Sequence, residues 1–211
     1  MPSGRQRSRA WAVVALFCAV ALAALAALVA TRWHPLISLD IATDKSAHDA
    51  VVAHHWLERA SRDITQLGDT RVIDLLTIAG AVAAATRRRW DLVALVVGVR
   101  LLEYGVNWLA KGLVDRPRPH LLHPVADVGG ASFPSGHAAG TAAVFGVLTL
   151  LFLRAGNRAL TYIVVSVVVL LIVCVGASRV LLGVHYPSDV AAGFLVGGLA
   201  LAVMRFALPA K

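Results

Sequence analysis

Long runs of apolar residues separated by shorter polar segments dominate this chain. The first run, 11–30, contains no polar residue, and about 20 helical residues are enough to cross the hydrocarbon core of a bilayer. The pattern predicts five further membrane helices at 72–86, 91–110, 137–153, 160–176 and 190–207. The run at 72–86 is short for a span and would need locally thinned lipid. We therefore expect an all-α, polytopic membrane protein with six transmembrane helices.

The first apolar run has two interpretations. Basic residues precede it, as in a cleaved secretory signal peptide, and small residues lie near its end. The apolar core of a signal peptide is usually about 7 to 15 residues long, however, and this run is longer. We therefore expect a retained membrane helix.

The run at 91–110 carries a line of polar residues at helical spacing. Intervals of three, four and four separate Arg100, Glu103, Asn107 and Lys111. Such intervals place all four side chains on one stripe of a helix, which should face protein or water instead of lipid. The stripe is either a ladder of interhelical hydrogen bonds or a device that also positions Lys111.

The distribution of basic residues predicts the topology. With six spans, ten of them fall on one side of the membrane: Arg5, Arg7, Arg9, Arg87, Arg88, Arg89, Arg154, Arg158, Arg205 and Lys211. Positive charge marks the cytoplasmic side, so both termini should be cytoplasmic. The polar segments 31–71, 111–136 and 178–189 would then share the outer face, and 111–136 is predicted to be a loop because it is proline-bearing and non-periodic.

Segment 31–71 is the longest part of the chain predicted to lie outside the membrane. Ser46 followed by Asp49 resembles a capping box, and apolar residues at helical spacing follow, which predicts a helix lying on the membrane surface. His48, His54 and His55 could suggest a metal site, but His54 and His55 are adjacent and would point to different faces of a helix. We therefore interpret these histidines as solvated or facing lipid headgroups.

Composition agrees with a membrane protein and excludes several other classes. The chain is 58% hydrophobic and only 15% charged, whereas soluble domains are typically about 25% charged. Its net charge of +8 comes from scattered residues and not from one basic stripe, which argues against a nucleic-acid partner. Cys18 and Cys174 both lie in apolar runs and predict no disulfide framework. Without repeats or a linker, residues 1–211 are expected to form a single domain.

Three cations lie where positive charge is disfavoured, on the predicted outer side: Lys111, Arg118 and Arg179. An arginine fork can bind phosphate through two parallel hydrogen bonds, and lysine adds a mobile point charge. Each residue taken alone could equally extend towards lipid headgroups. Together they indicate an anionic ligand.

The sequence Pro134-Ser135-Gly136-His137 stands directly before an apolar run. Ser135 or Gly136 is therefore expected to cap a helix whose free backbone N–H groups point towards an anion. His137 adds a group that can carry a proton at the same place.

The segment 178–189 carries a histidine and an aspartate four residues apart. The carboxylate of Asp189 is expected to accept a hydrogen bond from one ring nitrogen of His185, which would leave the other nitrogen available as a nucleophile or base.

These three motif segments, Lys111 to Pro119, Pro134 to His137 and Ser178 to Asp189, resemble in residue type, spacing and order the signature of the type 2 phosphatidic acid phosphatase superfamily. That superfamily also includes bacterial acid phosphatases, glucose-6-phosphatase and vanadium haloperoxidases. The resemblance implies phosphoryl transfer without metal or other cofactor, with His185 forming a phosphohistidine, Asp189 orienting it, and His137 acting as acid and then base. It further implies five phosphate-binding residues: Lys111, Arg118, Ser135, Gly136 and Arg179. Asp115 and Arg116 are expected to be structural.

A site held at the membrane surface by spanning helices suits a phosphorylated lipid. We expect hydrolysis of phosphatidic acid, phosphatidylglycerol phosphate or a polyprenyl diphosphate in a bacterial cytoplasmic membrane, with membrane lipids as further partners and no nucleic acid. Two alternatives remain: a non-enzymatic lipid carrier or channel, for which Arg100 and Glu103 could mark a pathway, and a vanadate-dependent oxidase of the haloperoxidase type.

Overall fold

Helices make up all the regular structure in the part of the chain that the computed structural model describes, which is residues 4–119, 129–152 and 158–208. The elements in chain order are α1 (Gly4–Ala30), α2 (His34–Ala53), α3 (His55–Thr65), the short 3-10 helix η1 (Gln66–Gly68), α4 (Thr70–Ala85), α5 (Trp90–Val114), α6 (Gly136–Phe152), α7 (Arg158–Leu181) and α8 (Pro187–Ala207). The prediction of an all-α fold is confirmed.

Each of the six predicted apolar runs forms a helix. Four of these helices, α1, α5, α7 and α8, are long and apolar enough to cross a membrane. The apolar helix α6 is shorter, at 17 residues, and α4 has 16. The chain therefore has several apolar spans, as the hydropathy pattern predicts.

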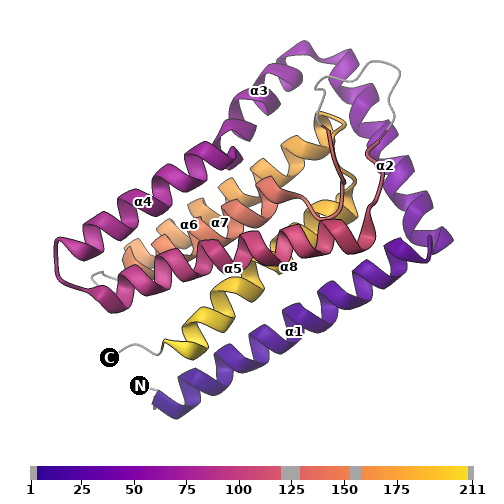
Figure 1. Cartoon of the computed structure of the whole chain (residues 1–211). Coiled ribbons are helices and arrows are strands. Elements are labelled where there is room, and N and C mark those ends of the chain that lie inside the picture. The colour runs from indigo at the N-terminus through magenta and orange to yellow at the C-terminus, as the bar shows by residue number, and fades with distance from the viewer. Residues whose placement is uncertain (1–3, 120–128, 153–157, 209–211) are drawn as a thin grey trace.

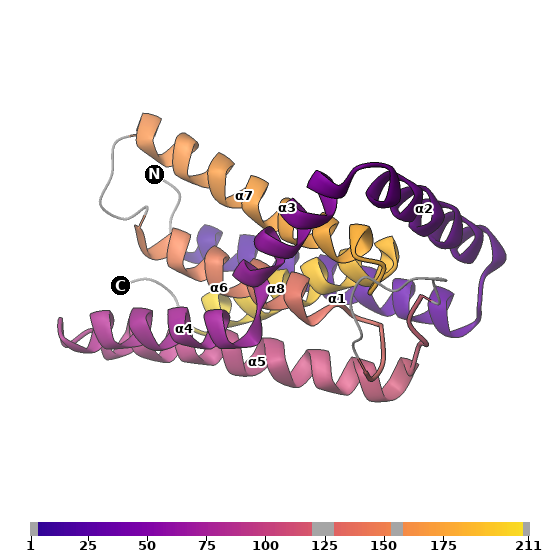
Figure 2. The same cartoon turned by 90° about the horizontal axis from the view of Figure 1, so that it is seen from above.

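The helices run between two distinct ends of the molecule (Figure 1). The described start of α1, the end of α8 and the turn from α4 to α5 lie at one end. The other end holds the last turn of α5, the first turn of α6 and the α7–α8 connection, with α2 and α3 crossing beside it. Seen from above, α4 and α5 lie side by side, and α6 separates them from α7 (Figure 2).

Helices α6 and α8 approach each other through glycine. A Cβ atom on Gly193 would lie 2.5 Å from the Ser135 carbonyl oxygen, and one on Gly197 would lie 2.6 Å from the Ala139 carbonyl oxygen. Only glycine permits this separation, as in other close helix pairs of membrane proteins. The contact brings the first turns of the two helices together, where the Ser135 backbone N–H donates to the Asp189 carbonyl oxygen at 2.9 Å.

Two of the predicted helix ends are wrong in a way that affects the site. Lys111 was predicted to begin a loop, but α5 continues through the apolar Leu113 and Val114 and ends at Asp115, whose backbone is left-handed (φ 40°). Likewise α7 continues beyond the predicted end at residue 176, so that Arg179 lies in its last turn. Both cations are thus held by helices and not by loops.

The helix predicted to start at Ser46 is also wrong in its boundaries. Helix α2 runs without interruption through this position, and the Ser46 hydroxyl donates to the Ala42 carbonyl oxygen, one turn earlier. The helix instead begins at His34, next to Pro35, a residue suited to a first turn. The helical conformation is interrupted at His54, and α3 starts at the next residue.

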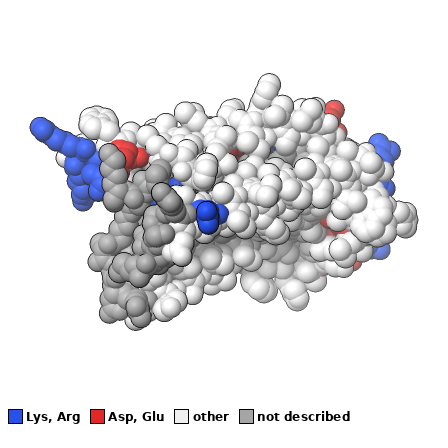
Figure 3. Space-filling model, turned by 90° about the horizontal axis from the view of Figure 1, so that it is seen from below, with Lys and Arg blue, Asp and Glu red and all other residues white. Residues whose placement is uncertain are grey.

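Charged residues concentrate towards the two ends of the molecule. On the face shown in Figure 3, most blue and red side chains lie near either end, and the coloured surface between them is largely white with one blue patch. Arg87, Arg88 and Arg89 occupy the α4–α5 turn, at the end opposite the motif segments. Of the residues used to predict the topology, Arg154 and Lys211 lie outside the described residues, as do the side chains of Arg5, Arg7 and Arg158.

Candidate active site

The three motif segments meet at one end of the helix bundle. Helix α5 carries Lys111 in its last turn, α6 begins at Gly136, and α7 carries Arg179 in its last turn. His185 lies in the short connection between α7 and α8, with only 3% of its surface exposed. Residues that are up to 78 positions apart in the sequence thus face one small region.

The two ring nitrogens of His185 face different partners. Nε2 lies 3.2 Å from Nη1 of Arg118, whereas Nδ1 lies 3.4 Å from the Ser132 hydroxyl and 3.7 Å from Oδ2 of Asp189. Because a guanidinium can only donate, Nε2 must present its lone pair and Nδ1 must carry the proton. The structure therefore brings His185 and Asp189 together, but their separation exceeds a direct hydrogen bond, and the Ser132 hydroxyl contacts both.

The surroundings of His185 keep its imidazole neutral. Burial away from water lowers its pKa to about 4, and the nearby charges of Arg118 and Arg179 act in the same direction, while the Asp189 carboxylate opposes them. At neutral pH the ring is therefore unprotonated at Nε2, the form that a nucleophile requires.

Asp189 is fully buried and accepts hydrogen bonds on both carboxylate oxygens. Oδ2 accepts from the Ser132 hydroxyl at 2.5 Å and from the Tyr186 backbone N–H at 2.9 Å. Oδ1 accepts from Nη1 of Arg116 at 2.7 Å. These donors fix the carboxylate at the start of α8.

Lys111 and Arg118 both contact the chain just before α6. The Lys111 ammonium donates to the Ala131 carbonyl oxygen at 2.6 Å. Arg118 donates to the carbonyl oxygens of Gly130 at 3.1 Å and Val184 at 2.7 Å. The two side chains therefore approach the region of His185 from the same side, held by neutral oxygens that leave their positive charges unneutralised.

Arg179 lies in the last turn of α7 and is 5% exposed. Its Nη1 donates to the Thr65 hydroxyl at 2.6 Å, and its Nε has no hydrogen-bond partner among the described residues. A buried guanidinium with an unused donor is suited to bind an anion. Thr65 belongs to α3, which the sequence did not connect with the site.

Helix α6 begins at Gly136, where the sequence predicted a helix start. Ser135 is fully buried and stands directly before the first helical residue, Gly136, with its hydroxyl 3.5 Å from the Ala138 backbone nitrogen. His137 follows in the first turn and is packed beneath Gly68 of η1, where a Cβ atom would lie 3.1 Å from the His137 Cβ. The absence of a side chain at Gly68 thus leaves room for His137 to pack against η1.

Arg116 joins the site to α2 through a buried network that the sequence did not reveal. Besides Asp189, its guanidinium contacts the Ser188 hydroxyl at 2.7 Å and the Asp40 carboxylate at 2.8 Å, and it lies 4.1 Å from the centre of the Tyr186 ring. Asp40 is 1% exposed and also accepts from the Ser188 backbone N–H at 3.0 Å. In the sequence, this role could have been suspected from the position of Asp40 between the apolar Leu39 and Ile41, because a carboxylate that becomes buried needs a partner.

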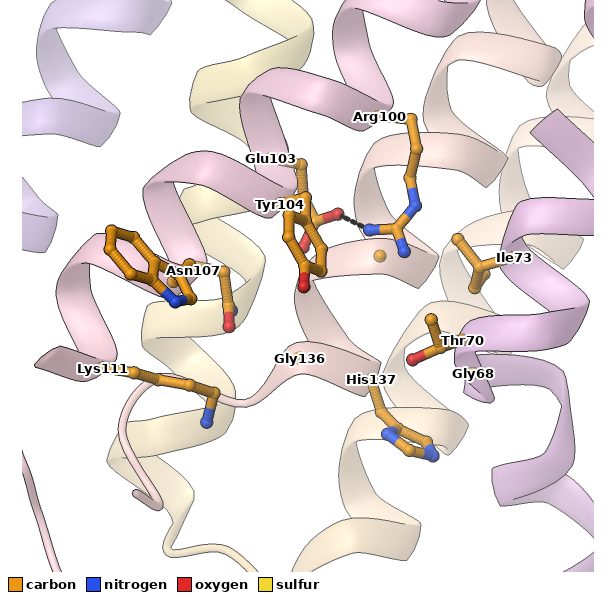
Figure 4. Close-up of a pocket in the computed structure, with 12 residues that line it drawn as sticks. Gly68, Thr70, Ile73, Arg100, Glu103, Tyr104, Asn107, Lys111, Gly136 and His137 are labelled. Atoms are coloured by element: carbon orange, nitrogen blue, oxygen red, sulfur yellow. Dashed lines mark hydrogen bonds and ion pairs between the residues drawn. The ribbon is translucent and has the colours of Figure 1, made fainter. Parts of the chain in front are cut away.

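A cavity of about 230 Å³ opens beside the start of α6 (Figure 4). We call it the side cavity. Its wall is formed by residues of η1, α4, α5 and α6: Gly68, Thr70, Ile73, Arg100, Glu103, Tyr104, Asn107, Trp108, Lys111, Gly136, His137 and Gly140. The polar stripe predicted on α5 therefore faces this cavity and reaches His137.

Comparisons with known sequences agree with this arrangement. The sequence model of the PAP2 superfamily matches residues 91–210 of this chain. Phosphatidylglycerophosphatase B of Bacillus subtilis is 33% identical over 168 residues, which are 76% of this chain and 78% of that protein. Decaprenylphosphoryl-5-phosphoribose phosphatase of Mycobacterium tuberculosis is 33% identical over 171 residues, which are 78% of this chain and 88% of that protein.

Solved structures show the same architecture. A crystal structure of a transmembrane PAP2 type phosphatidylglycerolphosphate phosphatase from Bacillus subtilis superposes with a TM-score of 0.75 at 29% identity, and the match covers 88% of this chain and 93% of that one. The crystal structure of Aquifex aeolicus LpxE superposes with a TM-score of 0.63 at 22% identity, covering 79% and 94%, which shows a shared fold.

Proposed function

The chain belongs to the PAP2 superfamily, in its branch of integral-membrane lipid phosphatases, and from this premise we propose that it hydrolyses a lipid phosphate or diphosphate through a phosphohistidine on His185. One observation carries the proposal. The lone pair of Nε2 of His185 faces Arg118, while Nδ1 faces Ser132 and Asp189. The imidazole is thereby oriented with its nucleophilic nitrogen towards a cation that would hold the substrate phosphate.

In the first step, Nε2 of His185 attacks phosphorus in line with the leaving oxygen. The new N–P bond forms as the P–O bond breaks, and His137 donates a proton to the departing alkoxide or phosphate. The positive charge that develops on the imidazole is stabilised by Asp189, which faces Nδ1. Residues of this chain supply every group in the step, in keeping with a metal-independent superfamily.

The phosphate oxygens are held by five groups in this proposal. Lys111, Arg118 and Arg179 provide positive charge, and the Ser135 hydroxyl and Gly136 amide provide donors at the start of α6. Charge on the equatorial oxygens is stabilised by such fixed donors in phosphoryl transfer. The neutral hydrogen-bond partners of Lys111 and Arg118 support this role, because those contacts leave the cationic charge available to an anion.

In the second step, water hydrolyses the phosphohistidine. His137, unprotonated after the first step, removes a proton from the water as its oxygen attacks phosphorus. The P–N bond breaks, its electron pair returns to Nε2 of His185, and inorganic phosphate leaves. Both histidines are then back in their starting protonation states.

The substrate class is a phosphorylated membrane lipid: phosphatidic acid, phosphatidylglycerol phosphate or a polyprenyl diphosphate. The names of the Bacillus and Mycobacterium relatives place them among enzymes acting on a phosphatidyl lipid and a decaprenyl lipid. Their identities to this chain are equal, so the relatives do not separate these substrates.

The proposed topology has six spans, formed by α1 and α4 to α8, within a single domain over residues 1–211. Both termini are cytoplasmic, and the active site faces the outer side of a bacterial cytoplasmic membrane. Arg87, Arg88 and Arg89 at the end opposite His185 support this orientation. Segment 31–71 lies outside the lipid core, and α3, with its charged face, lies along the membrane surface.

Phosphate release by the purified protein tests the activity. A panel of lipid monophosphates and diphosphates in detergent micelles, with and without a chelator of divalent metals, should show release that the chelator leaves unchanged. The His185→Ala variant should release none, because the nucleophile is lost. Equal turnover by this variant, or strict dependence on added metal, would sink the proposal.

Trapping the intermediate tests the covalent step. Wild-type protein mixed with ³²P-labelled substrate and quenched in alkali should carry an acid-labile label on His185, since phosphohistidine survives alkali. The His137→Ala variant should retain the label longer, because it lacks the base for the second step. Label found on His137 of the wild-type protein would reverse the assignment of the two histidines.

A further inference from the structure

Apart from Lys111, the residues of the polar stripe on α5 have no role in the two chemical steps. The stripe lines the side cavity from Lys111 beside the site to Arg100, eleven residues away, which is about 16 Å along a helix. In Figure 4, Asn107 and Tyr104 lie between these two ends, with His137 and Gly136 across the cavity from them. A polar-walled cavity next to a phosphate site can hold the rest of a substrate.

Asn107 is the residue in this wall with an unmet hydrogen-bonding requirement. It is 7% exposed, and its Nδ2 has no hydrogen-bond partner among the described residues. Leaving a buried amide unpaired is costly, so such a group usually has a partner in the working state of a protein. Asn107 lies one helical turn, about 6 Å, from Lys111.

The far end of the side cavity does not favour a second anion. Arg100 donates through Nε to Asp74 at 2.8 Å, and through Nη1 to the Glu103 carboxylate. One cation therefore meets two carboxylates, and this end carries no net positive charge. A phosphate is held at the Lys111 end, and the group beyond it should be uncharged.

The position of the two histidines indicates which part of the substrate enters. His137, the proposed acid for the leaving oxygen, lies in the wall of the side cavity, whereas His185 does not. In an in-line displacement the leaving group points away from the nucleophile. The leaving group of the substrate therefore lies in the side cavity.

We propose that the side cavity binds the alcohol part of a lipid monophosphate and that Asn107 hydrogen-bonds an uncharged oxygen on it, a hydroxyl or an ester carbonyl, about one helical turn from the phosphate. This inference rests on the proposed function and narrows its substrate class. Phosphates of acylated or hydroxylated alcohols should be preferred to phosphates of plain hydrocarbon alcohols.

The test compares two soluble monophosphates on the full-length protein. Lysophosphatidic acid carries both oxygen types, whereas dodecyl phosphate carries none beyond its phosphate. The Asn107→Ala variant should lose roughly 10-fold in kcat/KM for lysophosphatidic acid, the loss expected from one hydrogen bond, and should be unchanged with dodecyl phosphate. Leu101→Ala, an exposed position on the same helix outside the side cavity, is the control and should leave the ratio of the two rates unchanged.

A third substrate separates the two oxygen sources. An ether-linked glycerol phosphate keeps the hydroxyl and lacks the ester carbonyl. If it loses rate in Asn107→Ala as lysophosphatidic acid does, the hydroxyl is the partner; if it behaves as dodecyl phosphate does, the carbonyl is. Asn107→Ser, which is smaller and still polar, repeats the comparison should the alanine variant be too unstable to purify.

The outcomes distinguish this inference from the activity on which it rests. Wild-type protein that releases phosphate from no lipid of the panel described above contradicts the proposed function. Wild-type protein that acts on that panel but on none of the three substrates overturns this inference alone. Wild-type protein that hydrolyses them, together with an equal loss on lysophosphatidic acid and dodecyl phosphate in both Asn107 variants, overturns the role of Asn107 and leaves the activity in place.

Discussion

The two sides of the site are built on different principles. One side consists of the ends of α5 to α8 and carries all the residues proposed to touch phosphate or react with it. The other side consists of α2 and α3 and reaches the site only through other residues: Asp40 through Arg116, and Thr65 through Arg179. Chemistry fixes the residue types on the first side, whereas the second needs only a buried acceptor at the right place.

This difference explains why one side has a recognisable sequence signature and the other does not. A nucleophile, its orienting acid and a set of phosphate donors cannot be exchanged for other residue types. A buried hydrogen-bond acceptor such as Thr65 could be replaced by several others. The following predictions measure how far the two sides differ in their effect on rate.

The largest effect is expected for Asp189→Asn on the side formed by the ends of α5 to α8, which we call the reacting side. The variant removes the negative charge that faces Nδ1 of His185 and leaves Arg116 with one carboxylate partner fewer. Loss of the equivalent charge beside a catalytic histidine in serine proteases costs about 10⁴-fold, and we expect a fall in kcat of roughly 1,000-fold or more. Steady-state phosphate release, with trapping of any phosphohistidine, measures it; a change below 10-fold would contradict the orienting role.

A smaller but substantial effect is expected for Asp40→Asn on the side formed by α2 and α3, which we call the supporting side. The variant leaves the buried Arg116 charge undercompensated, so Asp189 loses its fixed position and kcat should fall about 10- to 100-fold. KM should change little, because no proposed phosphate contact is removed. Steady-state kinetics that determine kcat and KM separately are the measurement.

Asp63→Asn provides the matched control for that prediction. Asp63 is an exposed acid in the same segment, on α3, and its change should leave both kinetic constants as in the wild type. If Asp40→Asn raises KM and leaves kcat unaltered, the network does not act through Asp189.

Thr65→Val should have a modest effect that appears in KM. The substitution keeps the shape of the side chain and removes the hydroxyl that accepts from Arg179. The guanidinium then loses one fixing contact while keeping its charge, and we expect KM to rise about 3- to 10-fold with little change in kcat. A fall in kcat alone would show that Arg179 contributes after substrate binding.

The last prediction needs no change of sequence and concerns the pKa of His185 in the wild-type protein. Burial by both sides of the site lowers its pKa to about 4, so the ring should stay neutral as the pH falls from 7 to about 5 and gain a proton only near pH 4. Nitrogen-15 NMR of histidine-labelled protein in detergent measures the midpoint, with His185→Gln to assign the signal. A midpoint near 6.5 would show that the ring is solvated.

The sequence predicted the helices well and the site partly, for physical reasons. Long apolar runs favour helices, which satisfy their own backbone hydrogen bonds, and all six runs form helices. The ends of α5 and α7 were missed because apolar residues such as Val114 and Leu181 carry those helices past the polar Lys111 and Arg179.

The contacts of the supporting side lay outside what a sequence pattern contains. Asp40 and Thr65 are ordinary residues whose importance comes only from burial next to Arg116 and Arg179, across intervals of 76 and 114 positions. Local periodicity carries no information on such pairings. The roles of His137, His185 and the phosphate-binding residues stay predictions until the variants above are measured.

The contact between Asp40 and Ser188 has a consequence for how the enzyme is made. These residues are 148 positions apart, so the ribosome completes most of the chain before both partners exist. Asp189 and its Ser135 backbone contact come from the same late stage of synthesis. A nascent chain halted before α8 therefore lacks Ser188 and Asp189, and the buried network around Arg116 closes only after α8 has been made.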